Sequence, residues 1–336
     1  MEIHPQLDGS DLVFIGGESR TSLTGDVYSA NLDRGTLTRI TSDGRIGSNP
    51  DVSDGRVVWS YFDGDRSNVY TSSVAAPKPE SVPSTVSGVG GVRIDGDRLF
   101  WNGAAPGSAP DSTFDHIYSY NLTSGQGTVR VSGGAGRWDL SVQDNRIVWT
   151  GPGTPNGFYP GPFDVFALDL ESGKFSRVTS DGLSSDAEVS GDLIVYTKWV
   201  VATANYEIYT YRFSDNRESR LTTNQHADFG AKVFGTRIAW VAQPEFRSQV
   251  FLTDLALDLT VAVTDEDTSV GHISMSDRYL AWEDYGPTGD TGVRIMVGEV
   301  IVEHYPLRYL SFGLALAGGA VVMTMSIWRR RKPGAE

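Results

Sequence analysis

Residues 189–196, Val-Ser-Gly-Asp-Leu-Ile-Val-Tyr, contain a turn sequence followed by four consecutive apolar residues, the last of them aromatic. Ser-Gly-Asp favours a tight turn, and a short apolar run after a turn is typical of a strand that is buried on both faces. A similar aliphatic–aromatic triplet recurs along the chain, ending at Phe14, Trp59, Trp101, Trp149, Tyr196, Trp240 and Trp282. The chain therefore consists of seven similar units.

A second motif, a β-branched residue followed by an aromatic one, lies between the triplets. It occurs at Val27-Tyr28, Val69-Tyr70, Ile117-Tyr118, Val165-Phe166, Ile208-Tyr209 and Val250-Phe251. The interval from the aromatic residue of this motif to the end of the next triplet is 31, 31, 31, 30, 31 and 31 residues. The interval from a triplet end to the aromatic residue of the following second motif varies from 11 to 17 residues. Length variation is confined to one connection per repeat, which is typical of a closed array with loops on one face.

Each repeat has room for four short strands. In residues 186–225 we expect them at Ala187–Val189, Leu193–Tyr196, Glu207–Arg212 and Ser219–Thr222. This pattern predicts an all-β fold, a seven-bladed β-propeller of four-stranded blades. The outermost strand is expected to end in a threonine in four repeats, at Thr41, Thr179, Thr222 and Thr264. The repeats are expected near residues 5–45, 49–88, 91–134, 137–182, 186–225, 230–267 and 272–305.

Three stretches resemble a known repeat: residues 52–59, residues 189–196 and residues 164–179. They look like the TolB-type, WD-like propeller repeat, and the likeness covers residues 5 to about 305. The chain differs from TolB in having seven repeats rather than six, in lacking the N-terminal α/β domain and in its apolar C-terminal segment. Such propellers also precede the hydrolase domain of prolyl-oligopeptidase-like peptidases, but this chain has no Gly-x-Ser-x-Gly nucleophile motif. The resemblance implies the fold rather than the function.

The composition excludes some functions. The formal net charge of −14 and the pI near 4.8 argue against a nucleic-acid partner, which requires clustered Lys and Arg. The chain contains no cysteine, which excludes disulfides, thiol catalysis and zinc–thiolate sites.

Residues 309–328 contain no charged side chain. At about 1.5 Å per residue a helix of this length spans the roughly 30 Å hydrocarbon layer, and Tyr309 and Trp328 stand where interfacial aromatics are common. The sequence predicts a linker at 306–308, a transmembrane α-helix at 309–328 and a basic cytoplasmic tail at 329–336, with the propeller extracytoplasmic. A buried core helix is the alternative.

This topology requires an export signal, and the first residues, Met-Glu-Ile-His-Pro-Gln, show neither a basic nor an apolar region. We expect that the signal is not present in this chain; a tail-anchored cytoplasmic protein is the alternative. The same tail also fits the layout of a processed surface-sorting signal. Small residues at Gly313, Ala317, Gly318 and Gly319 would allow dimerisation through the transmembrane helix.

Polar residues recur at two positions before each triplet end. Ten residues before it lie His4, Asn49, Gly91, Asp139, Asp186, Gly230 and His272, and eight before it lie Gln6, Asp51, Arg93, Ser141, Glu188, Lys232 and Ser274. Because the first strand of each blade lines the channel of a propeller, we expect two polar rings near the channel mouth. Such carboxylates and imidazoles could bind a divalent cation. The alternative is a solvated funnel in which Arg93 and Lys232 pair with Asp51 and Glu188.

Long variable loops are expected at residues 16–25, 102–115 and 151–163, the last carrying Phe158, Tyr159 and Phe163. These rings either form a recognition surface or pack onto their own blade. We hypothesise a non-catalytic, surface-anchored binding or scaffold protein that engages a protein, peptide or glycan through these loops, without a cofactor. The alternative is a metal-assisted hydrolase or lyase at the channel mouth. The candidate channel residues are Asp139, Asp186, His272, Asn49, Arg93, Glu188 and Lys232.

Overall fold

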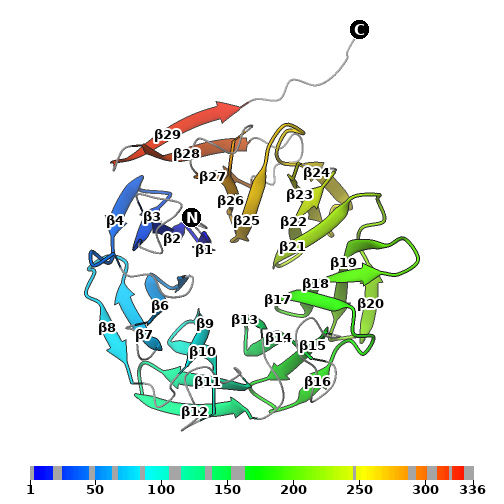
Figure 1. The fold of residues 1–336 in the computed structure, drawn as a ribbon, viewed down its shortest axis with the longest axis horizontal. Helices are drawn as coiled ribbons and strands as arrows, with labels where there is room; N and C mark the ends of the chain where they lie inside the picture. The colour runs from blue at the N-terminus through cyan, green and yellow to red at the C-terminus, as the bar shows by residue number, and fades with distance from the viewer. Residues whose placement is uncertain are drawn as a thin grey trace.

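The computed structural model describes residues 4–17, 25–44, 50–62, 67–83, 88–105, 115–132, 138–152, 163–244, 247–286, 293–300, 309–317 and 320–328. Within these residues the chain forms seven antiparallel sheets around a central axis (Figure 1). The seven-bladed all-β propeller predicted from the repeats is therefore confirmed. In each blade the strands run in chain order from the axis to the rim, so the first strand lines the centre.

The strands of the first four blades follow in chain order. They are β1 (Gln6–Asp8), β2 (Asp11–Gly16), β3 (Asp26–Asn31), β4 (Thr36–Arg39), β5 (Asp51–Ser53), β6 (Arg56–Phe62), β7 (Ser67–Ser73), β8 (Glu80–Val82), β9 (Val89–Asp95), β10 (Arg98–Gly103), β11 (His116–Asn121), β12 (Gln126–Val131), β13 (Trp138–Gln143), β14 (Arg146–Pro152), β15 (Phe163–Asp169) and β16 (Phe175–Arg177).

The last three blades complete the ring. Their strands are β17 (Ser184–Ser190), β18 (Leu193–Val200), β19 (Asn205–Arg212), β20 (Arg217–Arg220), β21 (Ala227–Phe234), β22 (Arg237–Gln243), β23 (Gln249–Asp254), β24 (Leu259–Ala262), β25 (Val270–Met275), β26 (Tyr279–Asp284), β27 (Arg294–Glu299), β28 (Tyr309–Ala317) and β29 (Ala320–Trp328).

The two sequence motifs are cross-strand neighbours. Trp149 lies directly opposite Phe166, and their nearly parallel rings have centroids 5.9 Å apart. The same stacked pair occurs at Phe14–Tyr28, Trp59–Tyr70, Trp101–Tyr118, Tyr196–Tyr209 and Trp240–Phe251. Facing pairs of this kind stabilise a sheet and fix its register. In blade 7 the position opposite Trp282 belongs to Met296, which explains why this repeat lacks the second motif.

The core lies between the blades. One apolar cluster joins Val148 and Val165 of blade 4 to Ala187, Val189 and Ile194 of blade 5. Because neighbouring blades pack on both sides of it, the second strand of each blade is buried on both faces. In blade 1 the side chains of Leu12, Val13 and Phe14 are almost fully buried. This packing accounts for the apolar triplets, because a polar side chain there would lose its contact with water.

Buried carboxylates anchor the fourth strands. Thr179 Oγ1 accepts a 2.9 Å hydrogen bond from the amide of Val165 and donates a 3.1 Å bond to Asp164 Oδ1. Arg177 pairs with the same carboxylate, which is fully buried. Equivalent threonine contacts occur in blades 1 and 5, between Thr41 and Asp26 and between Thr222 and Glu207. The expectation that these threonines end the fourth strand is wrong, since each lies two residues beyond it.

Blades 1 and 7 close the ring without exchanging strands, because each is made of contiguous chain. Their apolar faces form one cluster that includes Leu12, Phe14, Ala281 and Ile295.

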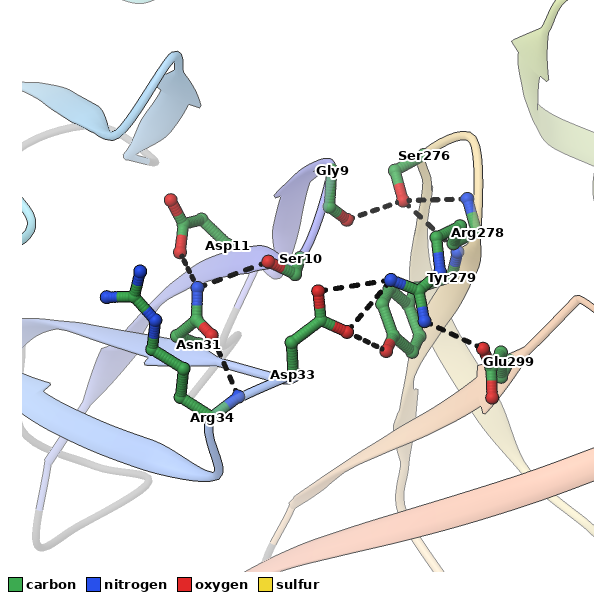
Figure 2. Close-up of polar contacts among 10 residues, drawn as sticks. All are labelled: Gly9, Ser10, Asp11, Asn31, Asp33, Arg34, Ser276, Arg278, Tyr279 and Glu299. Atoms are coloured by element: carbon green, nitrogen blue, oxygen red, sulfur yellow. Dashed lines mark hydrogen bonds and ion pairs between the residues drawn. The ribbon is translucent and has the colours of Figure 1, made fainter.

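Polar contacts add to this closure. Ser276 Oγ donates to the carbonyl of Gly9 at 2.8 Å, and the hydroxyl of Tyr279 donates to Asp33 at 2.8 Å (Figure 2). Arg278 bridges Asp33 and Glu299, at 2.9 Å to each.

The C-terminal segment differs from its prediction. Residues 309–317 and 320–328 form strands β28 and β29, so blade 7 has five strands (Figure 1). Gly318-Gly319 divides the segment into two nine-residue halves, and Val321, Val322 and Ile327 favour a strand.

The free edge of β27 supplies the physical reason for this pairing, because an unpaired edge offers a row of backbone groups to any strand. The transmembrane helix is thus not confirmed, and among the described residues no helix is long and apolar enough to cross a bilayer. The position beside β27 belongs to β28, and residues 301–305 lie outside the described residues. The linker at 306–308 and the tail at 329–336 lie outside the described residues.

Candidate binding site in the central channel

The inner strands of four consecutive blades are interrupted at the same level. Their pairing with the second strand shifts between Trp138 and Ser141, Ser185 and Glu188, Phe229 and Lys232, and Val270 and Ile273. Each shift leaves two residues without a partner on the neighbouring strand, as in a β-bulge. These pairs contain the positions ten residues before the triplet end, so the upper ring predicted from the sequence coincides with a row of bulges on the innermost strands.

The bulges hold non-glycine residues in the left-handed conformation. Asp139 and Asp186 both have φ of 52°, whereas the equivalent residue of blade 6 is Gly230 with φ of 63°. Glycine adopts this conformation at little cost, and aspartate tolerates it better than most residues. At this position blades 4 and 5 thus have a carboxylate, whereas blade 6 has a glycine, which adopts the left-handed conformation without strain.

The two carboxylates influence each other's charge. Asp139 lies on β13, the innermost strand of blade 4. Loss of hydration inside the ring, and next the charge of Asp186, raise the pKa of Asp139 to about 6, against the attraction of Lys232. Repulsion of this kind is relieved when a cation lies close to the pair.

The second ring, two residues further along each strand, is linked by charge. Lys232 of blade 6 forms an ion pair with Glu188 of blade 5. Burial acts to raise the pKa of Glu188, but Lys232 and Arg93 outweigh it and lower that pKa below its ordinary value. The Lys232–Glu188 pairing predicted for a solvated funnel is therefore present.

The same ring continues at blades 2 and 3. Asp51 Oδ2 accepts a 2.9 Å hydrogen bond from the amide of Ile94, and burial raises the pKa of Asp51 against the attraction of Arg93. Arg93 donates to the carbonyl of Val92 at 3.0 Å. Asp51 and Arg93 thus interact electrostatically, and the lower ring contains two neighbouring acid–base pairs, Asp51 with Arg93 and Glu188 with Lys232.

A carboxylate that sequence reasoning missed lies beside this ring, between blades 7 and 1. Glu283 is fully buried and accepts hydrogen bonds from the amide of His4 (2.7 Å), the hydroxyl of Tyr285 (2.7 Å) and the amide of His272 (3.3 Å). Burial acts to raise its pKa, but the bonds from His272 and Tyr285 outweigh burial and lower the pKa to about 2. Gly271 makes room for it, since a Cβ there would overlap the Glu283 carboxylate.

One feature of the sequence could have identified Glu283 as a candidate. Glu283 directly follows the triplet end Trp282, so two charged residues, Glu283 and Asp284, end a strand that is otherwise apolar. Buried charges require partners, and those partners include the amides of His4 in blade 1 and His272 in blade 7. The charge of Glu283 was therefore visible in the sequence, although the identity of its partners was not.

The loop residues are only partly described. Phe158, Tyr159 and Asn49 lie outside the described residues, whereas Phe163 is the first residue of β15 and is half-buried. Its amide donates to the carbonyl of Gly182 at 3.1 Å. In the part of the chain that the structure covers, no three His, Asp or Glu side chains are arranged to hold a metal ion. The divalent cation stays a sequence-based prediction.

No family model matches the sequence, and no curated protein matches it either. Solved structures do match the fold. The putative TolB from Agrobacterium tumefaciens is 16% identical with a TM-score of 0.52, over 73% of this chain and 90% of its own. The chain has a TolB-like β-propeller fold.

Two further structures come from peptidases. The β-propeller domain of the Trilobed protease from Pyrococcus furiosus, described as having an open velcro topology, is 10% identical with a TM-score of 0.67, over 91% of this chain and 95% of that one. Puromycin hydrolase is 9% identical with a TM-score of 0.68, over 93% of this chain. This TolB-like chain spans only 58% of the puromycin hydrolase chain.

These likenesses correct the functional hypothesis. A non-catalytic, surface-anchored binding or scaffold protein is overturned as the leading interpretation, because several structures that share the fold over more than nine-tenths of the chain come from peptidases. The sequence pattern identified the repeat correctly, but the functional hypothesis drawn from it was wrong. The absence of a nucleophile motif had been given too much weight, since a propeller can act together with a separate catalytic unit.

Proposed function

We propose that this propeller handles peptides for a peptidase. In this proposal the channel receives a peptide through a positively charged group, either its terminal ammonium or a Lys or Arg side chain, and presents it to a hydrolase unit outside these 336 residues. Asp139 and Asp186 bind the positive group, while Lys232 and Arg93 keep Glu188 and Asp51 neutralised. The observation that carries the proposal is the Asp139–Asp186 pair, where neighbouring negative charge raises the pKa of Asp139.

Three features support a cationic ligand at this pair. Both residues hold left-handed backbone at a bulge, where glycine would be unstrained, so their side chains are retained at some conformational cost. The net charge of −14 attracts cations over a distance of nanometres at low salt. The neighbouring bases are already engaged, since Lys232 pairs with Glu188.

The likeness to peptidase propellers supports a peptide as the ligand. It extends over 93% of this chain for puromycin hydrolase and 91% for the Trilobed protease propeller. A peptide combines a cationic terminus with backbone groups that can form hydrogen bonds with exposed backbone groups of the inner strands. An inorganic cation has only the first of these properties.

The proposal is tested by peptide binding. Peptides labelled at the C-terminus, with either a free or an acetylated N-terminus and with or without Lys, are titrated with the protein while fluorescence anisotropy is recorded. We expect binding to require a positive group and to weaken at least about tenfold in Asp139→Asn/Asp186→Asn. Asp144→Asn is the matched control, because Asp144 is another left-handed aspartate of blade 4, placed in the turn after β13. Equal binding of neutral peptides, or equal loss in the control, contradicts the proposal.

For residues 309–328 we propose a membrane-tethering role, supported by twenty uncharged residues followed by Arg-Arg-Arg-Lys. Flotation with liposomes of anionic and neutral lipid tests it. Val322→Arg is expected to abolish flotation, whereas Leu259→Arg, at an exposed leucine of β24, is expected to leave it unchanged. Flotation of the Val322→Arg protein contradicts this role.

A further inference from the structure

Blade 7 is extended by a hairpin at the rim of the ring. The other six sheets have four strands each within the described residues, whereas blade 7 adds the pair β28 and β29 outside β27 (Figure 1). Nine facing residue pairs join β28 to β29, but four join β28 to β27. The hairpin is thus paired more extensively with itself than with the propeller.

The sequence of this hairpin does not suit the place that it occupies. In five other blades the strand beside the third one is β4, β12, β16, β20 or β24, and every residue of these strands is exposed or half-buried. All of them except β24 contain an arginine, whereas β28 and β29 contain no charged residue. Charged residues on outer strands keep an open sheet edge from associating. A conflict between sequence and position of this kind is typical of a functional segment.

A lipid bilayer removes this conflict and requires a different structure. In hydrocarbon every backbone group must be paired, so a hairpin with an open edge cannot cross the layer, whereas a helix can. In water a helix of the same residues would expose apolar side chains all round, which is unfavourable. The basic residues that follow, Arg329-Arg330-Arg331-Lys332, favour a membrane surface with anionic headgroups. Water and lipid therefore favour two different structures of the same segment.

The closure of the ring rests on elements that lie inward of β28. Leu12 of blade 1 packs in one cluster with Ala281 and Ile295, which belong to β26 and β27. Arg278 pairs with Asp33 across the same seam at 2.9 Å. Without the hairpin, blade 7 keeps the three strands β25, β26 and β27. Departure of the hairpin therefore exposes the outer edge of β27 and leaves these contacts in place.

We propose that the β28–β29 hairpin is the form in which a membrane-inserting segment is kept in water. When the protein meets a bilayer that contains anionic lipid, the hairpin leaves the edge of β27 and the segment enters the bilayer as a helix. Away from lipid it stays paired with β27. This inference rests on the membrane-tethering role proposed above, to which it adds a release step, and it is independent of the peptide-handling role.

A disulfide between β27 and β28 blocks this release. Gly298 and Ser311 face each other, and Cα atoms of facing residues in antiparallel strands lie about 4.5–5.5 Å apart, within the range of a disulfide. A Cβ at Gly298 would meet Trp282 at 3.6 Å, an ordinary contact. The matched control is Thr253→Cys/Thr260→Cys, which joins the third and fourth strands of blade 6, where the two hydroxyls lie 2.8 Å apart. Because the chain has no cysteine, each variant forms one intramolecular disulfide.

The experiment is flotation with liposomes of phosphatidylcholine and phosphatidylglycerol, using each variant in its oxidised and its reduced state. We expect reduced Gly298→Cys/Ser311→Cys to float and the floating fraction to fall at least about tenfold on oxidation, because the disulfide holds the docked state. The control is expected to float equally in both states. If the oxidised variant floats as well as the reduced one, the release step is overturned while the tethering role stands. If neither the reduced variants nor the unaltered chain floats, the tethering role fails and the release step fails with it.

Hydrogen exchange in the unaltered chain gives a second measurement that needs no cysteine. Undocking frees the β27 amides that pair with β28, so we expect exchange in residues 294–299 to accelerate at least about tenfold when liposomes are added. The equivalent strand of blade 6, β23, keeps its outer neighbour and is expected to exchange at an unchanged rate. Unchanged exchange of β27 in the liposome-bound protein overturns the proposal.

Discussion

The carboxylate of Glu283 in blade 7 accepts a 2.7 Å hydrogen bond from the backbone amide of His4 in blade 1, 279 residues earlier in the chain. The same carboxylate accepts the hydroxyl of Tyr285 and the amide of His272, so one side chain joins both ends of the propeller. In a ring that lacks strand exchange, such a contact contributes to closure as well as to local order.

Glu283→Ala is therefore expected to destabilise the protein by about 2–4 kcal/mol, because it leaves buried amides without an acceptor. Urea unfolding followed by tryptophan fluorescence measures the change. Glu171→Ala, at an exposed turn position, is the control and is expected to stay within about 0.5 kcal/mol of the parent. A Glu283→Ala protein as stable as this control would show that the carboxylate does not hold the seam.

The pH dependence of stability follows from the same residue. Its folded pKa is about 2 and its ordinary value is 4.5, so its contribution is complete above pH 4.5 and is lost as the pH falls toward about 2. We expect the difference in unfolding free energy between the parent and Glu283→Gln to shrink across this window. A difference that is constant with pH contradicts the assignment.

Thr179→Val is expected to destabilise the protein by about 1–3 kcal/mol, because an isosteric apolar group removes both the acceptor of the Val165 amide and a donor to buried Asp164. Thr36→Val, on the exposed strand β4, is the matched control and is expected to change little. Thermal unfolding of the two variants side by side checks the prediction. Equal midpoints would mean that the threonine contact does not stabilise the fourth strand.

Ionisation of Asp139 changes the stability of the fold in the opposite direction to ionisation of Glu283. The pKa of Asp139 is raised from 3.8 to about 6, so its ionised form is unfavourable in the folded state, and this penalty appears as the pH rises through that interval. We expect Asp139→Asn to gain stability relative to the parent between pH 4 and about pH 6.5. Carboxyl titration by NMR checks the cause, since Asp186→Asn should move the Asp139 pKa toward 3.8. An unchanged pKa in that variant would exclude Asp186 as a contributor.

The repeat architecture could be predicted because the residues of each repeat contain the complete pattern of strands and turns. The constant interval from Tyr118 to Trp149 contains the outer strand of one blade and the inner strand of the next, and the stacked pair Trp149–Phe166 recurs in equivalent form in five other blades. The polar rings were likewise readable, since period-two alternation places Asp139 and Ser141 on the same inner strand.

Other features depended on contacts that a local pattern does not contain. The partners of Glu283 lie at opposite ends of the chain. The left-handed backbone of Asp139 follows from a bulge, which the alternation of polar and apolar residues does not reveal. For residues 309–328, an apolar run with β-branched residues fits a helix in lipid as well as strands on an open sheet edge, so composition alone could not decide between them.

The most direct test of the peptide-handling role is a calorimetric titration of the protein with a short free-amine peptide near pH 6, in buffers of different ionisation enthalpy. If the peptide's positive group binds at Asp139 and Asp186, it displaces the proton that Asp139 holds at this pH, so binding must release a proton into the buffer. The account predicts proton release in the parent protein and in Asp144→Asn, and weaker binding without release in Asp139→Asn. Binding of the free-amine peptide with no proton release, or equally tight binding of its acetylated form, would contradict it.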